Sequence, residues 1–470
     1  MRMNQTAERV NGALILAIVA VATVGGFMFG FDSGVINGTH KGLAATFGVG
    51  ALGEGLLTGA LLVGCAIGAF SAGRLADVIG RRNVMILAAI LFIISALGSG
   101  AAGSPVLFIL ARFIGGLGVG AASVTAPVYI SEVTPARTRG RMSSIQQVMI
   151  ITGLTGAFVS NYFFQQAAGA DSTADIWGFP AWRWMLWVQV IPATVYLLAL
   201  FTIPESPRYL VVKGRDDDAR KVLTNLFGAT AADLKVAEIR NSLSADHRPR
   251  LSDILDPVRG GLRPIIWAGL MLAIFQQLVG INVIFYYGAT LWQLAGFSEA
   301  DALRNNIVSG GVSIAACIFT ILVIDKIGRK PLLLIGSAGM SVALFAMVYA
   351  FSTGHLENGK DLVLEPNMGI FAFYAANAYV IFFNLSWGPV MWVMLGEMFP
   401  NQIRGSALAV CGLAQWTANF AISLTFPSMA ANLGLTLSYS FYAVCAVISF
   451  FLVSKLIQET KGKELEAMEG

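Results

Sequence analysis

Long apolar runs separated by short polar segments dominate the chain. Most runs reach about 20 residues, which is the length a helix needs to cross a bilayer. We therefore expect a membrane protein that crosses the bilayer many times. Hydropathy predicts twelve spans, at about 13–36, 52–74, 84–103, 105–131, 143–165, 184–203, 264–294, 305–324, 331–352, 367–396, 406–429 and 434–456.

One longer polar stretch divides six predicted spans from six. Within it, Asp216 to Leu226 and Ala231 to Leu243 have the pattern of short amphipathic helices. We predict an N-terminal bundle at 1–203, a cytoplasmic linker with short helices at 204–263, a C-terminal bundle at 264–456 and a cytoplasmic tail at 457–470.

Composition supports this class and excludes others. Apolar residues make up 56% of the chain and charged residues 12%, against about 25% charged in an average soluble protein. The net charge is only +4 and the basic residues are scattered, so we expect no nucleic-acid partner. The four cysteines lie in apolar runs without metal-ligand spacing, which argues against both a disulfide framework and a metal site.

Charge in the loops predicts the orientation. Cytoplasmic loops of membrane proteins carry an excess of Lys and Arg. One set of alternate loops holds Arg74, Arg81, Arg82, Arg137, Arg139, Arg141, Lys326, Arg329, Lys330 and Arg404, whereas the other holds only Lys41, Arg183, Arg304 and Lys360. We therefore expect the first set and both termini in the cytoplasm.

Two loop motifs occur once in each half. GRLADVIGRR at 73–82 follows the second span, and VIDKIGRK at 323–330 follows the eighth. EVTPARTRG at 132–140 and EMFPNQIRG at 397–405 follow the fourth and tenth spans, with Glu, Pro, Arg and Gly at identical spacing. The two matched pairs indicate duplication of a six-helix unit, which is typical of secondary transporters.

With PESPRYL at 204–210, QQLVGIN at 276–282, SWGPVMW at 386–392 and ETKG at 459–462, the chain resembles the sugar porter family of the major facilitator superfamily. It is similar to bacterial proton/monosaccharide symporters and to facilitative glucose transporters. The resemblance implies an all-α membrane protein with twelve transmembrane helices in two pseudo-symmetric six-helix bundles, short intracellular helices and alternating access. No Gly-rich ATP-binding motif is present, so we do not expect a primary pump. No catalytic constellation is found beyond Asp32 and Arg112, so we do not expect an enzyme.

Two opposite charges lie inside predicted spans, Asp32 in the first and Arg112 in the fourth. A charge at the centre of the bilayer costs at least ~2.5–3.5 kcal/mol, so it usually faces a cavity or a partner. One hypothesis is a structural ion pair that locks two helices. The other is a proton carrier whose protonation depends on the distance between the two groups. The resemblance favours the second, because proton-coupled members carry an acid at this position; the proton would then be the coupling ion, with no other cofactor.

Amide side chains in the apolar spans match the hydroxyls of a sugar, because each supplies donors and an acceptor. Any single amide would serve equally well as an interhelical contact. The resemblance assigns the sugar site to Phe29, Gln147, Gln276, Gln277, Asn282, Trp392, Gln415 and Trp416, and the outer gate to Tyr286 and Tyr287. Gly280, Gly288 and Gly388 are expected helix breaks. Leu154 and Ser313 depart from polar residues common in the family.

Acid and base side chains also gather at the cytoplasmic helix ends. The expected pairs are Asp77 with Arg81, Glu132 with Arg139, Asp325 with Arg329, and Glu397 with Arg404. They would either set topology alone or close an inner gate by linking the halves. We favour the gate, and the resemblance adds Glu205, Arg208 and Glu459 to it.

We predict a proton-coupled monosaccharide symporter of the bacterial inner membrane, which acts as a monomer on a hexose or pentose and contacts membrane lipid. A facilitative sugar uniporter and a polyol transporter of the inositol type remain open. A sugar sensor would need a longer tail, and a membrane enzyme would need a catalytic constellation. The three histidines fall in polar segments, which argues against a histidine relay.

Overall fold

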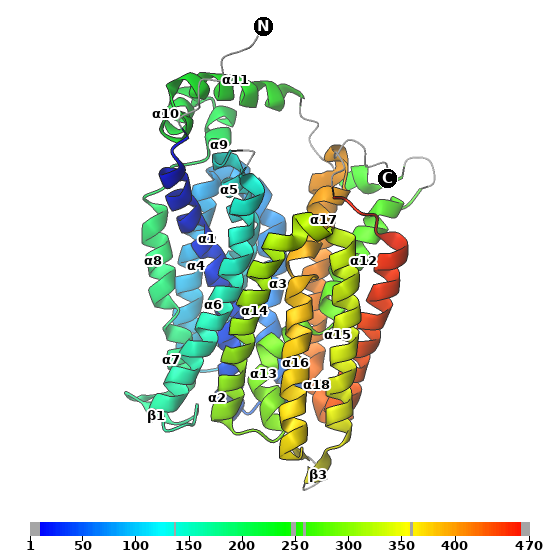
Figure 1. Ribbon diagram of the computed structural model, residues 1–470. Helices are drawn as coiled ribbons and strands as arrows, with labels where there is room; N and C mark the ends of the chain where they lie inside the picture. Colours follow the sequence, from blue (N-terminus) through cyan, green and yellow to red (C-terminus); the bar gives the residue numbers. More distant parts are fainter. Residues whose placement is uncertain (1–9, 136–137, 246–250, 257–259, 358–360, 462–470) are drawn as a thin grey trace.

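The computed structural model of the chain describes residues 10–135, 138–245, 251–256, 260–357 and 361–461. Long helices run side by side along one axis (Figure 1). Among the described residues, eleven helical stretches are long and apolar enough to cross a membrane. The fold class predicted from the sequence, an all-α membrane protein, is confirmed.

The first half of the chain forms six spans. Its elements are α1 (Gly12–Val35), η1 (Ile36–Gly38), α2 (His40–Phe47), α3 (Ala51–Ile79), α4 (Arg81–Ala101), α5 (Pro105–Val133), α6 (Arg139–Ala167), the hairpin β1 (Asp175–Ile176) and β2 (Phe179–Pro180), α7 (Ala181–Trp187) and α8 (Val190–Leu200). Glycines let α3 and α5 approach closely, because a Cβ at Gly64 or Gly116 would overlap a backbone carbonyl of the facing helix.

Short helices follow α8 at one end of the molecule. They are α9 (Pro207–Val212), α10 (Asp216–Phe227), α11 (Ala229–Ala245) and η2 (Leu251–Ile254). Helices α10 and α11 occupy the two segments whose amphipathic pattern predicted them. They lie at the end of the bundle at which α1 begins (Figure 1).

The second half repeats the arrangement. Its elements are α12 (Pro264–Leu278), α13 (Ile281–Leu294), α14 (Glu299–Ile327), α15 (Arg329–Ser352), the hairpin β3 (His355–Glu357) and β4 (Asp361–Val363), α16 (Pro366–Leu385), α17 (Pro389–Met398) and α18 (Asn401–Leu456). Gly434 has φ 76° and ψ 169° and interrupts α18, so this stretch contains both of the last two predicted spans. Twelve crossings result.

Two predicted helix breaks are confirmed and a third is wrong. Gly280, with φ 85°, separates α12 from α13, and Gly388 lies between α16 and α17. Gly288 instead lies within α13, where a Cβ would overlap Oδ1 of Asn306 and stand 3.1 Å from Nδ2 of Asn37. Its missing side chain permits close helix approach and does not bend the helix.

The two halves meet mainly along two helix pairs. Helix α3 packs against α18, and α6 packs against α14. These pairs occupy equivalent places in the two repeats, and α1 and α13 face one another between them. Side chains from α1, α6, α12, α13 and α18 therefore approach the same central region.

Candidate functional site

A fully buried ion pair joins α1 to α5. Nη1 of Arg112 lies 2.5 Å from Oδ1 of Asp32, and Nη2 donates to the backbone oxygen of Asp32 at 2.9 Å. Both side chains are at most 1% exposed. Burial of one charge alone would be strongly unfavourable, so each group depends on the other in this conformation.

Amides from three helices form one hydrogen-bonded network. Oε1 of Gln276 accepts from Nε2 of Gln277 at 3.0 Å and from Nε2 of Gln415 at 3.2 Å. Nδ2 of Asn282 donates to Oε1 of Gln277 at 2.5 Å. The structure thus brings together α12, α13 and α18 through four of the predicted sugar-site residues.

The break at Gly280 positions this network. Gln277 and Asn282 lie on opposite sides of the break, and a Cβ at Gly280 would stand 2.7 Å from the ring of Tyr442. The hydroxyl of Tyr379 donates to the carbonyl of Val279 at 2.7 Å and so satisfies a backbone group near the break. The second break contributes as well, because Gln276 donates to the carbonyl of Trp387 at 3.1 Å.

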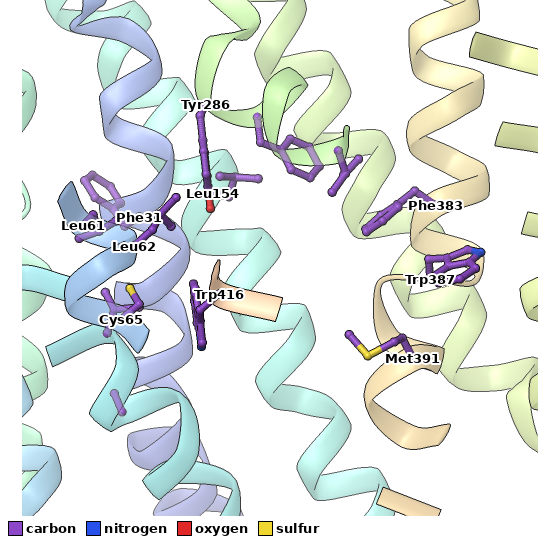
Figure 2. Packing of buried hydrophobic residues seen from close by; sticks show 14 of the residues in the cluster. Phe31, Leu61, Leu62, Cys65, Leu154, Tyr286, Phe383, Trp387, Met391 and Trp416 are labelled. Atoms are coloured by element: carbon purple, nitrogen blue, oxygen red, sulfur yellow. The ribbon is translucent and has the colours of Figure 1, made fainter. Parts of the chain in front are cut away.

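The other predicted sugar-site residues, three aromatic residues and Gln147, fall into two groups. Phe29 of α1 and Trp416 of α18 lie 5.7 Å apart between ring centroids, across the two halves. Figure 2 shows the Tyr286 side chain directed from α13 towards Trp416, beside Leu154. Trp392, in contrast, is 39% exposed, and Gln147 is only half-buried on α6. The structure therefore groups Phe29 and Trp416, and it leaves Trp392 and Gln147 open to the surroundings.

Asn37 in η1 closes the end of the molecule opposite to α9–α11. Its amide donates to the carbonyl of Phe285 at 2.7 Å and accepts from the backbone of Ala289 at 3.0 Å and from Nδ2 of Asn306 at 2.8 Å. All three partners belong to the second half of the chain. Sequence reasoning missed Asn37; its only signal is a polar residue directly after a long apolar helix.

His40 reinforces the same closure. Its Nε2 lies 2.9 Å from the carbonyl oxygen of Tyr286, and its ring stacks on Tyr287 at 4.7 Å. The hydroxyl of Tyr287 donates to the carbonyl of Ser423 at 2.6 Å. Burial lowers the pKa of His40 to about 4, so the ring is neutral in this arrangement. The two tyrosines predicted as an outer gate thus lie at a closed end.

A half-exposed ion-pair group lies outside this closure. Nζ of Lys41 lies 2.9 Å from Oδ1 of Asp171 and 2.7 Å from Oε2 of Glu299. Asp171 belongs to the first half of the chain and Glu299 to the second. Hydrogen bonds from Thr173 and Lys41 lower the pKa of Asp171 to about 2. Asn37, His40, Lys41, Glu54 and Glu299 also line a cavity of about 160 Å³ at this end.

Charged residues at the other end pair within each half. Arg81 contacts Asp77 at 3.0 Å and Glu132 at 3.2 Å, and Glu205 accepts from the backbone N–H groups of Arg81 and Arg82. The second half repeats this: Arg329 contacts Asp325 at 3.0 Å and Glu397 at 2.8 Å, and Glu459 accepts from the backbone of Arg329 and Lys330. Each glutamate next to a helix start stabilises the N-terminus of α4 or α15.

One expected pairing differs in the structure. Glu397 accepts both guanidinium bonds from Arg329, whereas the guanidinium of Arg404 donates to the carbonyl of Phe399. The expected pair of Glu132 with Arg139 involves a side chain outside the described residues, and Glu132 contacts Arg81 and Ser206. Arg208 lies half-buried in the first turn of α9. The ion pairs of Arg81 and of Arg329 at this end each join groups of the same half.

The described residues contain no group of three or more His, Cys, Asp or Glu side chains able to hold a metal ion. What the site offers is a buried acid, a cluster of amides and two aromatic rings. These groups suit recognition of a polar, uncharged ligand and binding of a proton.

Comparisons with known proteins agree with this geometry. The family described as "Sugar (and other) transporter" matches residues 18–470. A "Glucose transport protein" of Synechocystis sp. is 46% identical over 459 residues, which cover 97% of both chains. A "D-xylose-proton symporter" of Escherichia coli is 37% identical and covers 98% of this chain and 96% of its own.

Solved structures give the same result. The inward-open conformation of the xylose transporter XylE from E. coli has a TM-score of 0.83 at 35% identity, and the alignment covers 97% of this chain and 99% of that one. The same transporter bound to 6-bromo-6-deoxy-D-glucose has a TM-score of 0.79. The protein therefore belongs to the sugar transporter family of the major facilitator superfamily, and it is a membrane transporter and not an enzyme.

Proposed function

We propose that the protein is a proton-coupled monosaccharide symporter that works by alternating access. The observation that carries this proposal is the Asp32–Arg112 pair, an acid that is fully buried beside a base within the helix bundle. A purely structural contact between α1 and α5 could be made by apolar side chains, which are often at least as stable as a buried ion pair. Relatives named as xylose–proton and arabinose–proton symporters support coupling to a proton.

The amide network would hold the sugar mainly on the C-terminal half. Gln276, Gln277, Asn282 and Gln415 offer donors and acceptors, and Oε1 of Gln415 has no partner among the described residues although it is buried. Phe29 and Trp416 would cover an apolar face of the sugar ring. The amides bond to one another here, so a bound sugar would replace some of these bonds.

We infer the transport cycle from the interactions at the two ends of the bundle and from the Asp32–Arg112 pair. The outward-open form would bind a sugar with Asp32 protonated, and closure of the outer end through Asn37, His40, Tyr286 and Tyr287 would open the inner side. Release of the proton would let Asp32 pair with Arg112, which is the arrangement described above. One charge moving through 100 mV supplies about 2.3 kcal/mol, enough for accumulation of some tens-fold.

The charge asymmetry of the loops supports a position in the bacterial inner membrane with both termini in the cytoplasm. Residues 1–203 and 264–456 would move as two bundles, joined by 204–263, with 457–470 as the tail. The complete candidate pathway lies in one chain, so we propose that a lipid-embedded monomer is sufficient for transport.

The test of coupling is Asp32→Asn in proteoliposomes. Asn keeps the size of the side chain but cannot carry a proton, so uphill uptake should be lost while exchange of sugar at equilibrium continues. Alkalinisation outside the vesicle on addition of sugar should occur in the wild type only. Accumulation by Asp32→Asn, or a wild type without sugar-driven proton uptake, would favour a facilitative uniporter.

The test of the sugar site uses the variants Gln276→Ala, Asn282→Ala and Gln415→Ala. The control is Gln189→Ala, which removes a buried amide outside the network. Each of the first three should weaken binding about tenfold or more, because a lost bond strands its partner in a desolvated site. Counterflow with labelled glucose, xylose, arabinose and myo-inositol would identify the substrate. Unchanged affinity in all three variants would contradict this site.

A further inference from the structure

Only one of the two carboxylate oxygens of Asp32 takes part in the ion pair. Oδ1 and the backbone oxygen of Asp32 both accept from Arg112. Oδ2 is buried and has no hydrogen-bond partner among the described residues. A buried acceptor without a donor costs free energy, so we expect this oxygen to accept a further hydrogen bond at some stage of the cycle.

Ser95 of α4 supplies an unused hydroxyl in the same region. The side chain is 0% exposed, and its Oγ has no partner among the residues that the structure describes. Serines in a helix commonly donate to the carbonyl four residues earlier, as Ser313 and Ser341 do here at 2.7 Å. Ser95 does not, so its hydroxyl is free to turn towards another acceptor.

Gly115 of α5 brings the two oxygens together. A Cβ built on Gly115 would overlap Oγ of Ser95 and would stand 3.2 Å from Oδ2 of Asp32. Both oxygens therefore border the small space that the missing side chain leaves. They are within reach of a direct hydrogen bond after a side-chain rotation, or of a bond through one water molecule.

We propose that the Ser95 hydroxyl is the second donor to the Asp32 carboxylate, and that it holds this carboxylate when Arg112 moves away. Ser95 is a positioning residue that acts through Asp32 and does not itself carry the proton. The inference rests on the proposed proton coupling and adds a residue to it.

A donor to the carboxylate stabilises its charged form. Removal of that donor therefore favours the protonated acid and should extend proton-driven uptake to higher external pH. Other ionisable groups surround the pair and must remain unchanged in the test. They are Cys65 of α3, Tyr286 of α13 and His40 of α2, each of which interacts electrostatically with Arg112 or Asp32.

The experiment compares Ser95→Ala with Ser99→Ala. Ser99 lies one turn further along α4, is also 0% exposed and also has an unpartnered hydroxyl among the described residues. Active uptake and sugar counterflow are measured against external pH. We expect the alkaline limb of uptake to move up by about one pH unit in Ser95→Ala only, with counterflow unchanged. Ser95→Thr, which keeps the hydroxyl, should keep the wild-type profile.

Infrared spectroscopy gives a second and independent measurement. The C=O stretch of protonated Asp32, assigned by its loss in Asp32→Asn, should move to higher wavenumber in Ser95→Ala as a hydrogen bond is lost. An unchanged band, or a pH profile equal to that of Ser99→Ala, would overturn the proposal. Equal losses of uptake and counterflow would also overturn it, because they indicate a structural role. If the wild type takes up no protons, the coupling fails, and the infrared band still decides the role of Ser95.

Discussion

The two ends of the bundle are held in different ways. At the end opposite to α9–α11, which is the outer end in the proposed orientation, hydrogen bonds link η1 and α2 in the first half to α13 and α14 in the second. At the end where α9–α11 lie, the acids and bases pair within their own half. The comparison shows that these charged motifs can form ion pairs without joining the halves. In the proposed orientation, this closure of the outer end is the feature expected of an inward-facing conformation.

Burial varies among the interactions at each end, and it decides what each interaction contributes. Asn37 is 1% exposed, whereas the side chains of Asp77 and Asp325 are 71% and 82% exposed. A hydrogen bond in a desolvated site is costly to remove, and an exposed ion pair contributes little. Changes at the outer end should therefore shift the conformational equilibrium more than changes in exposed charges.

The largest effect is expected for Asn37→Ala. The change removes three buried bonds between the halves, so it should favour the outward-facing form by on the order of a hundredfold. A cysteine introduced at Gln293, which lines the outer cavity, would report the change through faster labelling by a membrane-impermeant thiol reagent. The four native cysteines are buried and add little background.

The matched control for this change is Asn432→Ala. Its amide donates to the carbonyl of Ser428 within the same helix, at an exposed position. Labelling should remain at the wild-type rate in this variant. Equal labelling in Asn37→Ala and Asn432→Ala would show that Asn37 does not hold the outer end closed.

A smaller effect is expected from pH through His40. Burial lowers its pKa to about 4 in the closed outer end, and opening would hydrate the ring and return it towards about 6.5. The open form then binds more protons between pH 6.5 and 4, so closure weakens as pH falls through this window. Labelling at Gln293→Cys, divided by the labelling of a free thiol at the same pH to correct for the falling thiolate fraction, should rise on the order of tenfold from pH 7 to pH 5.

His40→Gln should remove this pH dependence, because Gln does not titrate. His355→Gln is the control, since His355 is exposed in β3. Lys41, Glu54 and Glu299 line the same cavity and stay unchanged in both variants. A pH response that persists in His40→Gln would assign it to one of those groups.

Asn37 and His40 also show the limit of sequence reasoning. Hydropathy predicted the spans and the amphipathic pattern predicted the linker helices. The resemblance to the sugar porters assigned the residues around Gln276 to one site. Spacing along a helix correctly predicted Asp77 with Arg81 and Asp325 with Arg329, because both pairs are local. It did not find Arg81 with Glu132 or Asn37 with Asn306, because those contacts depend on how separate helices pack.

A further prediction concerns the charged residues at the end where α9–α11 lie. If the cytoplasmic acids link the halves in the outward-facing form, Glu397→Gln should weaken that form and lower net uptake several-fold while sugar still binds. Labelling at Gln293→Cys should fall accordingly. Asp325→Asn is the control, because it removes an exposed partner of the same Arg329. Equal behaviour of both variants would leave only a topological role for these charges.

The smallest effect is expected for Lys41→Gln at the outer end. Lys41 crosses between Asp171 and Glu299, but its side chain is 43% exposed, so solvent screens the interaction. The pKa of Asp171 is lowered to about 2, and its contribution is therefore complete above about pH 4 and lost only as pH falls towards 2. Labelling at Gln293→Cys should change less than twofold, equally at pH 5 and pH 8, and less still in high salt. A shift as large as that of Asn37→Ala would show that the exposed charges, and not the buried amide, hold the outer end closed.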